Sequence, residues 1–302
     1  MFLSTSDLTE LAQLATKAAQ QAGQIVIDKS QSSLDISKKE AGESQASQVV
    51  TEVDFLSQKI ILDILEPSCN QFDLALLTEE LPDNNQRFEK DYFWCVDPLD
   101  GTLPFIESKP GYAVSIALVS RDGVPIIGII FGPKERVLYQ AIQGSGAFRN
   151  GKPFKIKSKI PCPEQKLMFI SDRSFAQQAF YKDIKKEMER ISFEQGYGGV
   201  ITRTQGGAVM NACWVLEHKP ACYFKFPKVQ KGGGCLWDYA ATTCLFHEAG
   251  GIATDIKGIP LDLNRSDSLF LNHQGVIFCS DADLADAVKK LYKRYADESA
   301  FD

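Results

Sequence analysis

The pattern of apolar segments changes partway along this chain of 302 residues, and that change limits the folds it can adopt. Three apolar runs first follow one another, separated by short turn sequences, at 112–120, 125–131 and 137–142. From residue 166 onward expected strands alternate with expected helices; the strands are 166–171, 221–226 and 275–279, and the helices are 175–190, 206–217 and 237–248. Consecutive strands predict an antiparallel meander, whereas alternation predicts an α/β arrangement. The expected fold class is therefore an α+β half followed by an α/β half.

The two halves are expected to meet at the proline-containing segment 161–165. We predict an N-terminal α+β subdomain over residues 1–160 and a C-terminal α/β subdomain over residues 161–302. Helical spacing of apolar residues predicts further helices over 7–29, 52–65 and 282–296. Asp7 and Glu10 resemble a capping box, and Pro67 should mark the end of the second helix. The polar stretch 30–47 is expected to be a linker or a loop.

Charge and composition argue against several classes of function. The formal net charge is −6, which offers no basic footprint for nucleic acid. No apolar run approaches the ~20 residues that span a bilayer, and the first residues lack the basic region of a signal peptide. We therefore expect a cytoplasmic monomer or homodimer without nucleic-acid or membrane partners. The 8 cysteines lack zinc-like spacing and histidines number 3, so any catalysis should rest on carboxylates.

Five acidic residues stand where apolar segments begin or end: Asp54, Glu79, Asp97, Asp100 and Asp238. Each has an ordinary structural explanation. Asp54 and Asp238 could cap helices, Glu79 could lie in a solvated loop, and the Asp97-Pro-Leu-Asp-Gly segment could be a simple turn. Together they favour a metal site, because clustered carboxylates repel one another unless a cation neutralises them. Oxygen ligands without histidine or thiolate favour Mg²⁺, with Mn²⁺ also possible.

The spacing of Asp97 and Asp100 suits two ions roughly 4 Å apart, which can activate a water and stabilise an in-line displacement on phosphorus. In such a turn the Leu99 carbonyl would converge on the ions together with the two carboxylates. Thr102 follows at the start of a short segment, where its hydroxyl and nearby backbone N–H groups would face an anion. The residues alone thus indicate phosphate chemistry.

Four motifs occur in order along the chain: VVTEVD at 49–54, LLTEE at 76–80, WCVDPLDGT at 94–102 and CLWDYAATTCLFHEAGG at 235–251. In order and interval they resemble the inositol monophosphatase superfamily, whose pattern is Asp, Glu-Glu, D-P-[IL]-D-G-T and W-D-x-A-A. The segment GSGAFRNG at 144–151 is similar to a hairpin common in that family. Thr78 and Thr242 depart from the pattern, since the family usually has glycine at both positions.

The resemblance implies a layered α-β-α-β-α sandwich of the inositol monophosphatase and fructose-1,6-bisphosphatase type. It also implies Mg²⁺-dependent hydrolysis of phosphomonoesters and inhibition by Li⁺. Glu79 and Asp97, with the Leu99 carbonyl, would bind a first ion. Asp97, Asp100 and Asp238 would bind a second.

The same resemblance assigns the remaining catalytic roles. Asp54 would lie near a third, weaker ion and pair with Thr102. This pair would orient or deprotonate the attacking water. The backbone N–H groups of Gly101 and Thr102 would hold the phosphate that is cleaved.

Lys225 bears on the choice of substrate. Inositol monophosphatases have a Y-Y-E segment where this chain reads Tyr223-Phe224-Lys225. A cation cannot accept a hydrogen bond from a sugar hydroxyl, but it can hold a second phosphate. Bisphosphate nucleotidases of the superfamily carry a basic residue there, and Ser171 and Arg173 lie in a segment that resembles their Ser/Arg-containing loop.

We therefore expect a 3′(2′),5′-bisphosphate nucleotidase that converts 3′-phosphoadenosine 5′-phosphate to AMP and phosphate. Its substrate contacts would be Gly101, Thr102, Ser171, Arg173, Lys225 and Asp238. Gly206-Gly207-Ala208 departs from the polar segment that these nucleotidases often show. Phosphatases of inositol mono- or polyphosphates, or of other sugar phosphates, remain alternatives on the same fold. A non-catalytic regulator that binds cations or nucleotides, and acids that merely cap helices, are the alternatives from other classes.

Overall fold

The structure is a computed structural model that describes residues 2–30, 36–38, 49–156 and 161–297. Its α-helices are α1 (Thr5–Lys29), α2 (Glu52–Gln71), α3 (Thr102–Ile106), α4 (Arg173–Ala176), α5 (Tyr181–Glu194), α6 (Ala208–Glu217), α7 (Leu236–Ala249) and α8 (Ala282–Asp297). Its strands are β1 (Ile36–Lys38), β2 (Val49–Thr51), β3 (Ala75–Thr78), β4 (Tyr92–Asp100), β5 (Ala113–Ser120), β6 (Pro125–Gly132), β7 (Val137–Ile142), β8 (Gly146–Arg149), β9 (Lys152–Pro153), β10 (Leu167–Ile170), β11 (Val200–Arg203), β12 (Ala221–Lys225), β13 (Ile252–Thr254) and β14 (Val276–Cys279).

Two large sheets organise the described residues. The first has the strand order β3-β4-β5-β6-β7-β8-β9; β3 and β4 pair in parallel, and the later neighbours pair antiparallel. The second has the order β11-β10-β12-β14-β13, with β10 parallel to both of its neighbours and β14 antiparallel to both of its own. The predicted change from a meander to an α/β arrangement is confirmed.

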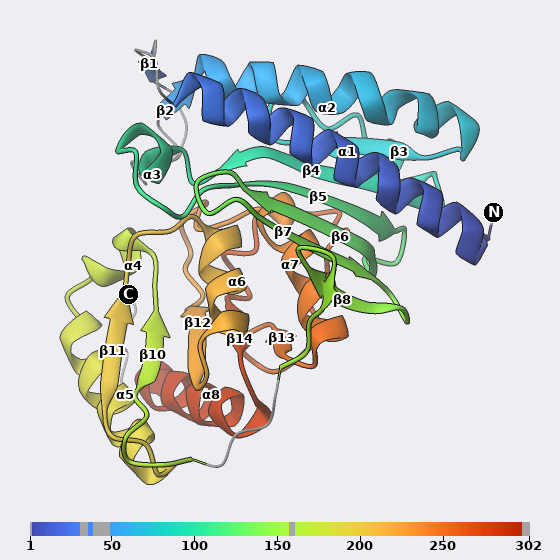
Figure 1. The fold of residues 1–302 in the computed structure, drawn as a ribbon. Coiled ribbons are helices and arrows are strands. Elements are labelled where there is room, and N and C mark those ends of the chain that lie inside the picture. The colour runs from blue at the N-terminus through green and yellow to red at the C-terminus, as the bar shows by residue number, and fades with distance from the viewer. Residues whose placement is uncertain (1, 31–35, 39–48, 157–160, 298–302) are drawn as a thin grey trace.

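Helices and sheets alternate in five layers (Figure 1). The helices α1 and α2 cover one face of the first sheet, and α6 and α7 lie between the two sheets. The helices α5 and α8 cover the outer face of the second sheet. Each interface buries a continuous apolar cluster, which is the main source of stability in such a layered fold. The expected α-β-α-β-α sandwich is confirmed.

The N-terminal helices differ from the sequence prediction at their ends. Ser4 caps α1: its hydroxyl accepts a hydrogen bond from the Asp7 N–H at 3.2 Å, and the Asp7 carboxylate accepts from the Ser4 N–H at 2.8 Å. The predicted box at Asp7 and Glu10 is therefore wrong, because Asp7 is the third helical residue. The helix α2 continues through Pro67, where the sequence predicted its end. Buried Ser68 accepts a hydrogen bond from the Trp94 indole at 3.0 Å, which ties this last turn to β4.

The expected helix over 175–190 is replaced by the short α4 followed by α5. Phe175 and Phe180 are five positions apart, which would place them on different sides of one straight helix. Their ring centroids nevertheless lie 5.4 Å apart in the aromatic core beside the second sheet. The strand β13 was not predicted, whereas the hairpin at Asn150-Gly151 is confirmed by the pairing of Arg149 with Lys152.

Some sequence predictions are not decided by this structure. Most of the predicted linker, 30–47, lies outside the described residues. The first sheet ends at Pro153 and the second begins at Leu167, while α7 packs against β5 and β6 of the first sheet. The division between residues 160 and 161 stays a prediction. Among the helices in the described part of the chain, none has the length and apolar character required to cross a lipid bilayer.

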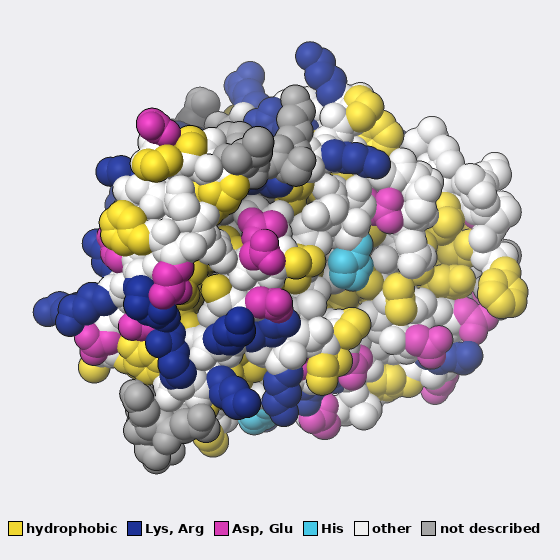
Figure 2. Space-filling view, turned by 90° about the horizontal axis from the view of Figure 1, so that it is seen from below, with side chains coloured by type: hydrophobic (Ala, Val, Ile, Leu, Met, Phe, Trp, Pro, Cys, Tyr) yellow, Lys and Arg dark blue, Asp and Glu magenta, His cyan; other side chains and the backbone are white. Residues whose placement is uncertain are grey.

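The face that carries α5 and α8 is highly charged. Figure 2 shows Lys and Arg side chains interspersed with Asp and Glu on the face seen from below in Figure 1. Glu187 on α5 illustrates this mixture, because it accepts from Arg190 of the same helix at 3.0 Å and from Arg294 of α8 at 2.6 Å. These exposed pairs link the two outer helices and contribute little individually to stability.

Candidate metal centre

An irregularity in β4 places Asp97 and Asp100 on the same side of the first sheet. Asp97 pairs with Ser115 of β5 and Asp100 pairs with Ala113, so three steps along β4 match two steps along β5. Side chains three positions apart in a regular strand point to opposite faces, but the additional residue of a bulge reverses this. The Asp97 carboxylate accepts a hydrogen bond from the Leu99 N–H at 3.0 Å, which fixes the bulge locally.

Asp100 is held by the N-terminus of α6. Its two carboxylate oxygens accept hydrogen bonds from the N–H groups of Ala208 at 3.0 Å and Val209 at 2.9 Å. A Cβ atom at Gly207 would lie 2.3 Å from an Asp100 oxygen, so a side chain at position 207 would displace the carboxylate. The glycine at this position thus permits the close approach of β4 to α6.

Asp238 comes from the first turn of α7 and completes the group. Its carboxylate accepts a hydrogen bond from the Cys235 N–H at 2.5 Å, so the predicted helix cap is confirmed. This role leaves further lone pairs on the carboxylate available to a ligand. Asp238 can therefore cap α7 and bind a metal ion at the same time.

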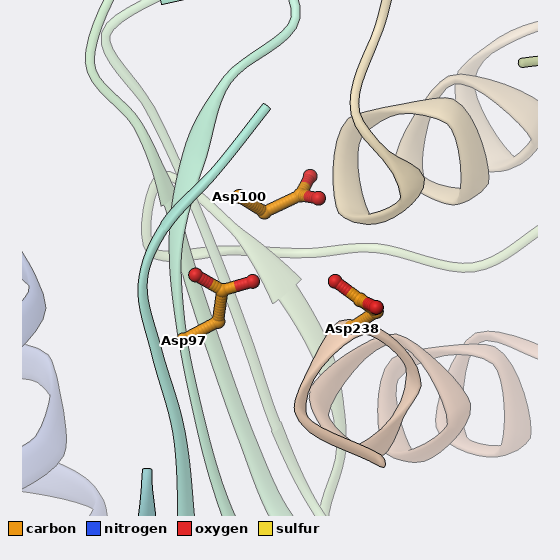
Figure 3. A group of neighbouring side chains, drawn as sticks. All are labelled: Asp97, Asp100 and Asp238. Carbon is orange, nitrogen blue, oxygen red and sulfur yellow. The ribbon is translucent and has the colours of Figure 1, made fainter. Parts of the chain in front are cut away.

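The three carboxylates converge on one point (Figure 3). Each of Asp97, Asp100 and Asp238 offers an oxygen that lies within 4.8 Å of the other two. Asp97 is only 1% exposed, and Asp100 is also buried. No other group of three potential metal-binding side chains comes as close within the described residues.

The pKa values of these carboxyl groups show that burying them close together is unfavourable when they are ionised. The pKa of Asp97 is raised well above its ordinary value, chiefly by burial. Neighbouring negative charges raise it further; in decreasing order they come from Glu79, Asp100, Asp238 and Asp54. The pKa of Asp100 is also raised well above its ordinary value, by burial and then by Asp238. All five acids identified in the sequence thus contribute to one electrostatic centre.

The donor set fits a hard divalent cation. Its donors are carboxylate oxygens, and their mutual repulsion in a buried setting would be relieved by a bound positive charge. Glu79 follows β3 immediately and donates its N–H to the Val96 carbonyl at 3.2 Å, which places it beside Asp97 on the neighbouring strand. Asp54 is buried in the first turn of α2, on the side of the first sheet that α2 covers.

The residues after Asp100 form the tight turn expected from the sequence. Gly101 has a φ of 82°, a left-handed conformation that favours glycine, and it precedes the single turn of α3. Thr102 is buried, and its hydroxyl lies 3.5 Å from the Leu99 carbonyl, to which it donates. Thr102 and Leu99 are therefore neighbours at the end of β4. Ser57 of α2 donates to the Pro98 carbonyl at 2.7 Å and secures the same segment from the other side.

Lys225 and Asp172 form a partly buried ion pair beside the acidic cluster. The Lys225 ammonium lies 2.5 Å from the Asp172 carboxylate, and the Lys225 side chain is 14% exposed. Burial, the largest single influence, would lower the pKa of Lys225, but the charge of Asp172 and the contacts with Asp172 and Tyr239 together outweigh it, and the pKa is raised. The Lys225 charge in turn acts to lower the pKa of Asp238 and Asp100. A cation therefore lies close to the metal centre, as its sequence position suggested.

The other two residues expected to contact substrate have protein partners. Arg173 forms a two-point ion pair with Glu107, at 2.5 and 2.6 Å. Ser171 is fully buried, and its hydroxyl lies 3.5 Å from that of Tyr181. Their roles in substrate binding stay predictions.

The structure adds three residues that sequence reasoning had not assigned to the site. Gly207 makes room for Asp100, as described above. Asp172 accepts from Lys225, from the Tyr223 hydroxyl at 2.8 Å and from the Asn211 amide at 3.1 Å. Tyr239 occupies the open position of W-D-x-A-A and donates to the Gly233 carbonyl at 3.0 Å. Tyr239 lies inside the motif at 235–251 and Asp172 lies between Ser171 and Arg173, but neither position indicates which partners these residues contact.

The two threonines that replace the family's usual glycines are accommodated by hydrogen bonds. Thr78 donates to the Gln58 side chain at 2.6 Å, and Thr242 donates to the Tyr239 carbonyl at 3.0 Å. Both side chains are buried. Neither replacement removes a member of the acidic cluster.

Comparisons with known proteins agree with this geometry. A family model described as the inositol monophosphatase family matches residues 7–293. The inositol-1-monophosphatase of Synechocystis sp. is 29% identical over 296 residues, which cover 97% of this chain and 94% of that protein. The 3′(2′),5′-bisphosphate nucleotidase CysQ of Escherichia coli is 30% identical over 226 residues, covering 74% and 82% respectively.

The fold has close counterparts among solved structures. The IMPase of Thermotoga maritima is similar with a TM-score of 0.72 at 22% sequence identity, over 95% of this chain and 98% of that one. The match to the family model extends over nearly the whole chain and includes every member of the acidic cluster. The chain belongs to the inositol monophosphatase family and is a metal-dependent phosphatase.

Proposed function

We propose that the chain is a Mg²⁺-dependent 3′(2′),5′-bisphosphate nucleotidase that converts 3′-phosphoadenosine 5′-phosphate to AMP and phosphate. The observation that carries this choice is the partly buried Lys225 ammonium beside Asp100 and Asp238. A cation at this place favours a substrate with a second anionic group over one that presents only hydroxyls. The similarity to CysQ supports the same choice.

Two ions would be held by the acidic cluster. Glu79, Asp97 and the Leu99 carbonyl would hold the first, and Asp97, Asp100 and Asp238 the second. Asp54 would take part in a third, weaker site. When bound, such ions neutralise charge on a phosphate and make a bound water more acidic. Mn²⁺ would be accepted by the same oxygen ligands.

The protein's own groups would organise the reaction. Asp54 and Thr102 would orient the attacking water and accept its proton, and both side chains are buried as this role requires. Water would attack phosphorus opposite the ester oxygen; the bond from phosphorus to that oxygen would break, and the leaving alkoxide would take up a proton. The N–H groups of Gly101 and Thr102 would bind the phosphate that is cleaved.

The second phosphate would contact Lys225, with Arg173 and Ser171 on the same side of the site. Because Lys225 is paired with Asp172 and Arg173 with Glu107, the phosphate would share these cations with carboxylates already present. This sharing would weaken binding of the second phosphate and favour its release after turnover.

Phosphate release from three substrates tests the proposal. The purified chain would be assayed with Mg²⁺ on 3′-phosphoadenosine 5′-phosphate, on 3′-AMP and on inositol 1-phosphate. We expect the highest kcat/KM for the bisphosphate. Lys225→Met should raise the KM for the bisphosphate more than the KM for 3′-AMP, which lacks the second phosphate. Equal effects on the two nucleotides would remove Lys225 as the basis of the choice.

Inositol monophosphate is a second candidate substrate, supported by the match to the Synechocystis enzyme along almost the whole chain. A higher kcat/KM for inositol 1-phosphate than for either nucleotide would establish it instead. In both cases Li⁺ would inhibit by competing for an ion site, which the same assay measures directly.

A further inference from the structure

We propose that Tyr239 is a positioning residue that holds the metal ligand Asp238 in place through the carbonyl group of Gly233. The Tyr239 hydroxyl donates to this carbonyl at 3.0 Å, and the Lys225 ammonium donates to the same oxygen at 2.6 Å. The two donors fill both lone pairs of one partly buried acceptor. These two hydrogen bonds hold Gly233 in place.

The loop that contains Gly233 leads directly to Asp238. Two residues after Gly233, the Cys235 N–H donates to the Asp238 carboxylate at 2.5 Å. Gly232, Gly233 and Gly234 all have positive φ angles, of 111°, 85° and 121°. Three successive glycines carry a large conformational entropy, so this segment needs side-chain contacts to hold one conformation.

The Tyr239 ring supplies those contacts directly. It is fully buried, and a Cβ atom at Gly234 would lie 2.2 Å from its hydroxyl oxygen. In addition, the Gly234 carbonyl accepts from the Leu271 N–H at 3.1 Å, and the Leu236 N–H donates to the Leu269 carbonyl at 3.0 Å. Backbone bonds therefore hold Gly234 and Leu236, and Tyr239 with Lys225 holds Gly233.

A substitution of Tyr239 tests the positioning role without changing a charge, whereas a substitution of Lys225 changes both. Removing the Lys225 ammonium would leave Asp172 uncompensated and would change the field at the metal centre. Tyr239→Phe removes one hydroxyl and no charge. The residue also stands at the open position of W-D-x-A-A, so the motif itself does not specify this tyrosine.

The test measures metal binding without any substrate. Mn²⁺ would be titrated into the metal-free full-length protein, and the free ion would be followed by electron paramagnetic resonance. We expect Tyr239→Phe to bind the ion held by Asp238 about tenfold more weakly, as is usual when a residue that orients a metal ligand is removed. Tyr139→Phe is the matched control, because Tyr139 is also buried and its hydroxyl donates to Glu217 at 2.5 Å, in a network apart from the acidic cluster.

Thermal unfolding of the metal-free proteins accompanies the titration. Both variants should lose similar stability, but only Tyr239→Phe should lose Mn²⁺ affinity. Equal Mn²⁺ affinity in Tyr239→Phe and the original chain would overturn the proposal. Because no substrate is present, this result is independent of which phosphate ester the enzyme prefers.

If Tyr239→Phe does not fold, a second variant tests the role of the Gly233 carbonyl. Lys225→Met combined with Asp172→Asn removes the other donor to Gly233 and leaves the net charge unchanged. It should weaken Mn²⁺ binding to a similar extent. Unchanged affinity in this double variant would contradict a role for the Gly233 carbonyl.

Discussion

Asp97 lies in surroundings that disfavour an ionised carboxylate and that a bound cation would relieve. It is almost completely buried, and burial together with four neighbouring acids raises its pKa. A buried carboxylate among like charges destabilises a fold unless something neutralises it. The sequence pointed to these five acids because each follows or precedes an apolar segment, and the structure gathers the other four around Asp97. The sequence could not show that Asp97 and Asp100 share one face, because that depends on a bulge.

Asp97→Asn should abolish turnover without unfolding the protein. The change removes one negative charge but keeps the oxygen that accepts from the Leu99 N–H. We expect kcat/KM to fall about a thousandfold, equivalent to roughly 4 kcal/mol of transition-state stabilisation. The metal-free variant should melt no lower than the original chain, since repulsion is relieved. The exposed Asp63→Asn is the control and should retain activity. Substantial activity in Asp97→Asn would contradict the assigned role.

Individual elements position the site through close approaches that composition and spacing do not reveal. The sequence predicted most helices and strands because their apolar periodicity is strong. It placed the end of α2 at Pro67 because proline usually stops a helix, whereas the contact of Ser68 with Trp94 maintains the last turn. Likewise, Gly206-Gly207-Ala208 was noted only as a departure from a polar segment. The structure shows that Gly207 makes room for the Asp100 carboxylate.

Gly207→Ala tests the contact between β4 and α6. The new methyl group would lie 2.3 Å from an Asp100 oxygen, so the carboxylate or the start of α6 must move. We expect Mg²⁺ affinity, measured by calorimetric titration, to fall about tenfold, with a destabilisation of roughly 1–3 kcal/mol from overpacking. If the variant binds Mg²⁺ as tightly as the original chain, then Asp100 is not held in place as described.

At the scale of the whole molecule, the layered fold brings together side chains that are far apart in the sequence. The carboxylates Asp97 and Asp100 come from the first sheet, and Asp238 comes from the helix layer between the sheets (Figure 3). Motif order and family resemblance predicted this meeting; periodicity alone could not. The Lys225–Asp172 pair, in contrast, was invisible in the sequence, because Asp172 has no spacing relation to Lys225.

The metal centre should make global stability depend on both pH and Mg²⁺. Folding raises the pKa of Asp97 and Asp100 above the ordinary 3.8, so the metal-free folded state binds more protons than the unfolded chain. Stability from these groups is present below about pH 4 and is lost as the pH rises through their raised pKa values. Mg²⁺ requires the ionised carboxylates, so its stabilising effect should grow from about pH 5 to about pH 8.

Differential scanning calorimetry across this pH range checks the expectation. At a Mg²⁺ concentration one hundred times its Kd, the ion should add about 2.7 kcal/mol near pH 8. The increase should be much smaller near pH 5 and nearly absent in Asp97→Asn. A Mg²⁺ effect that is independent of pH, or equal in the variant, would place the bound ion elsewhere.

The account rests on the claim that the three converging carboxylates bind divalent ions. A crystal of the protein soaked in Mn²⁺, measured at a wavelength where manganese scatters anomalously, tests it most directly. We expect an anomalous peak about 2 Å from oxygens of Asp97, Asp100 and Asp238, with a second peak nearby between Asp97 and Glu79. A crystal saturated with Mn²⁺ that shows no peak between these carboxylates would contradict the account.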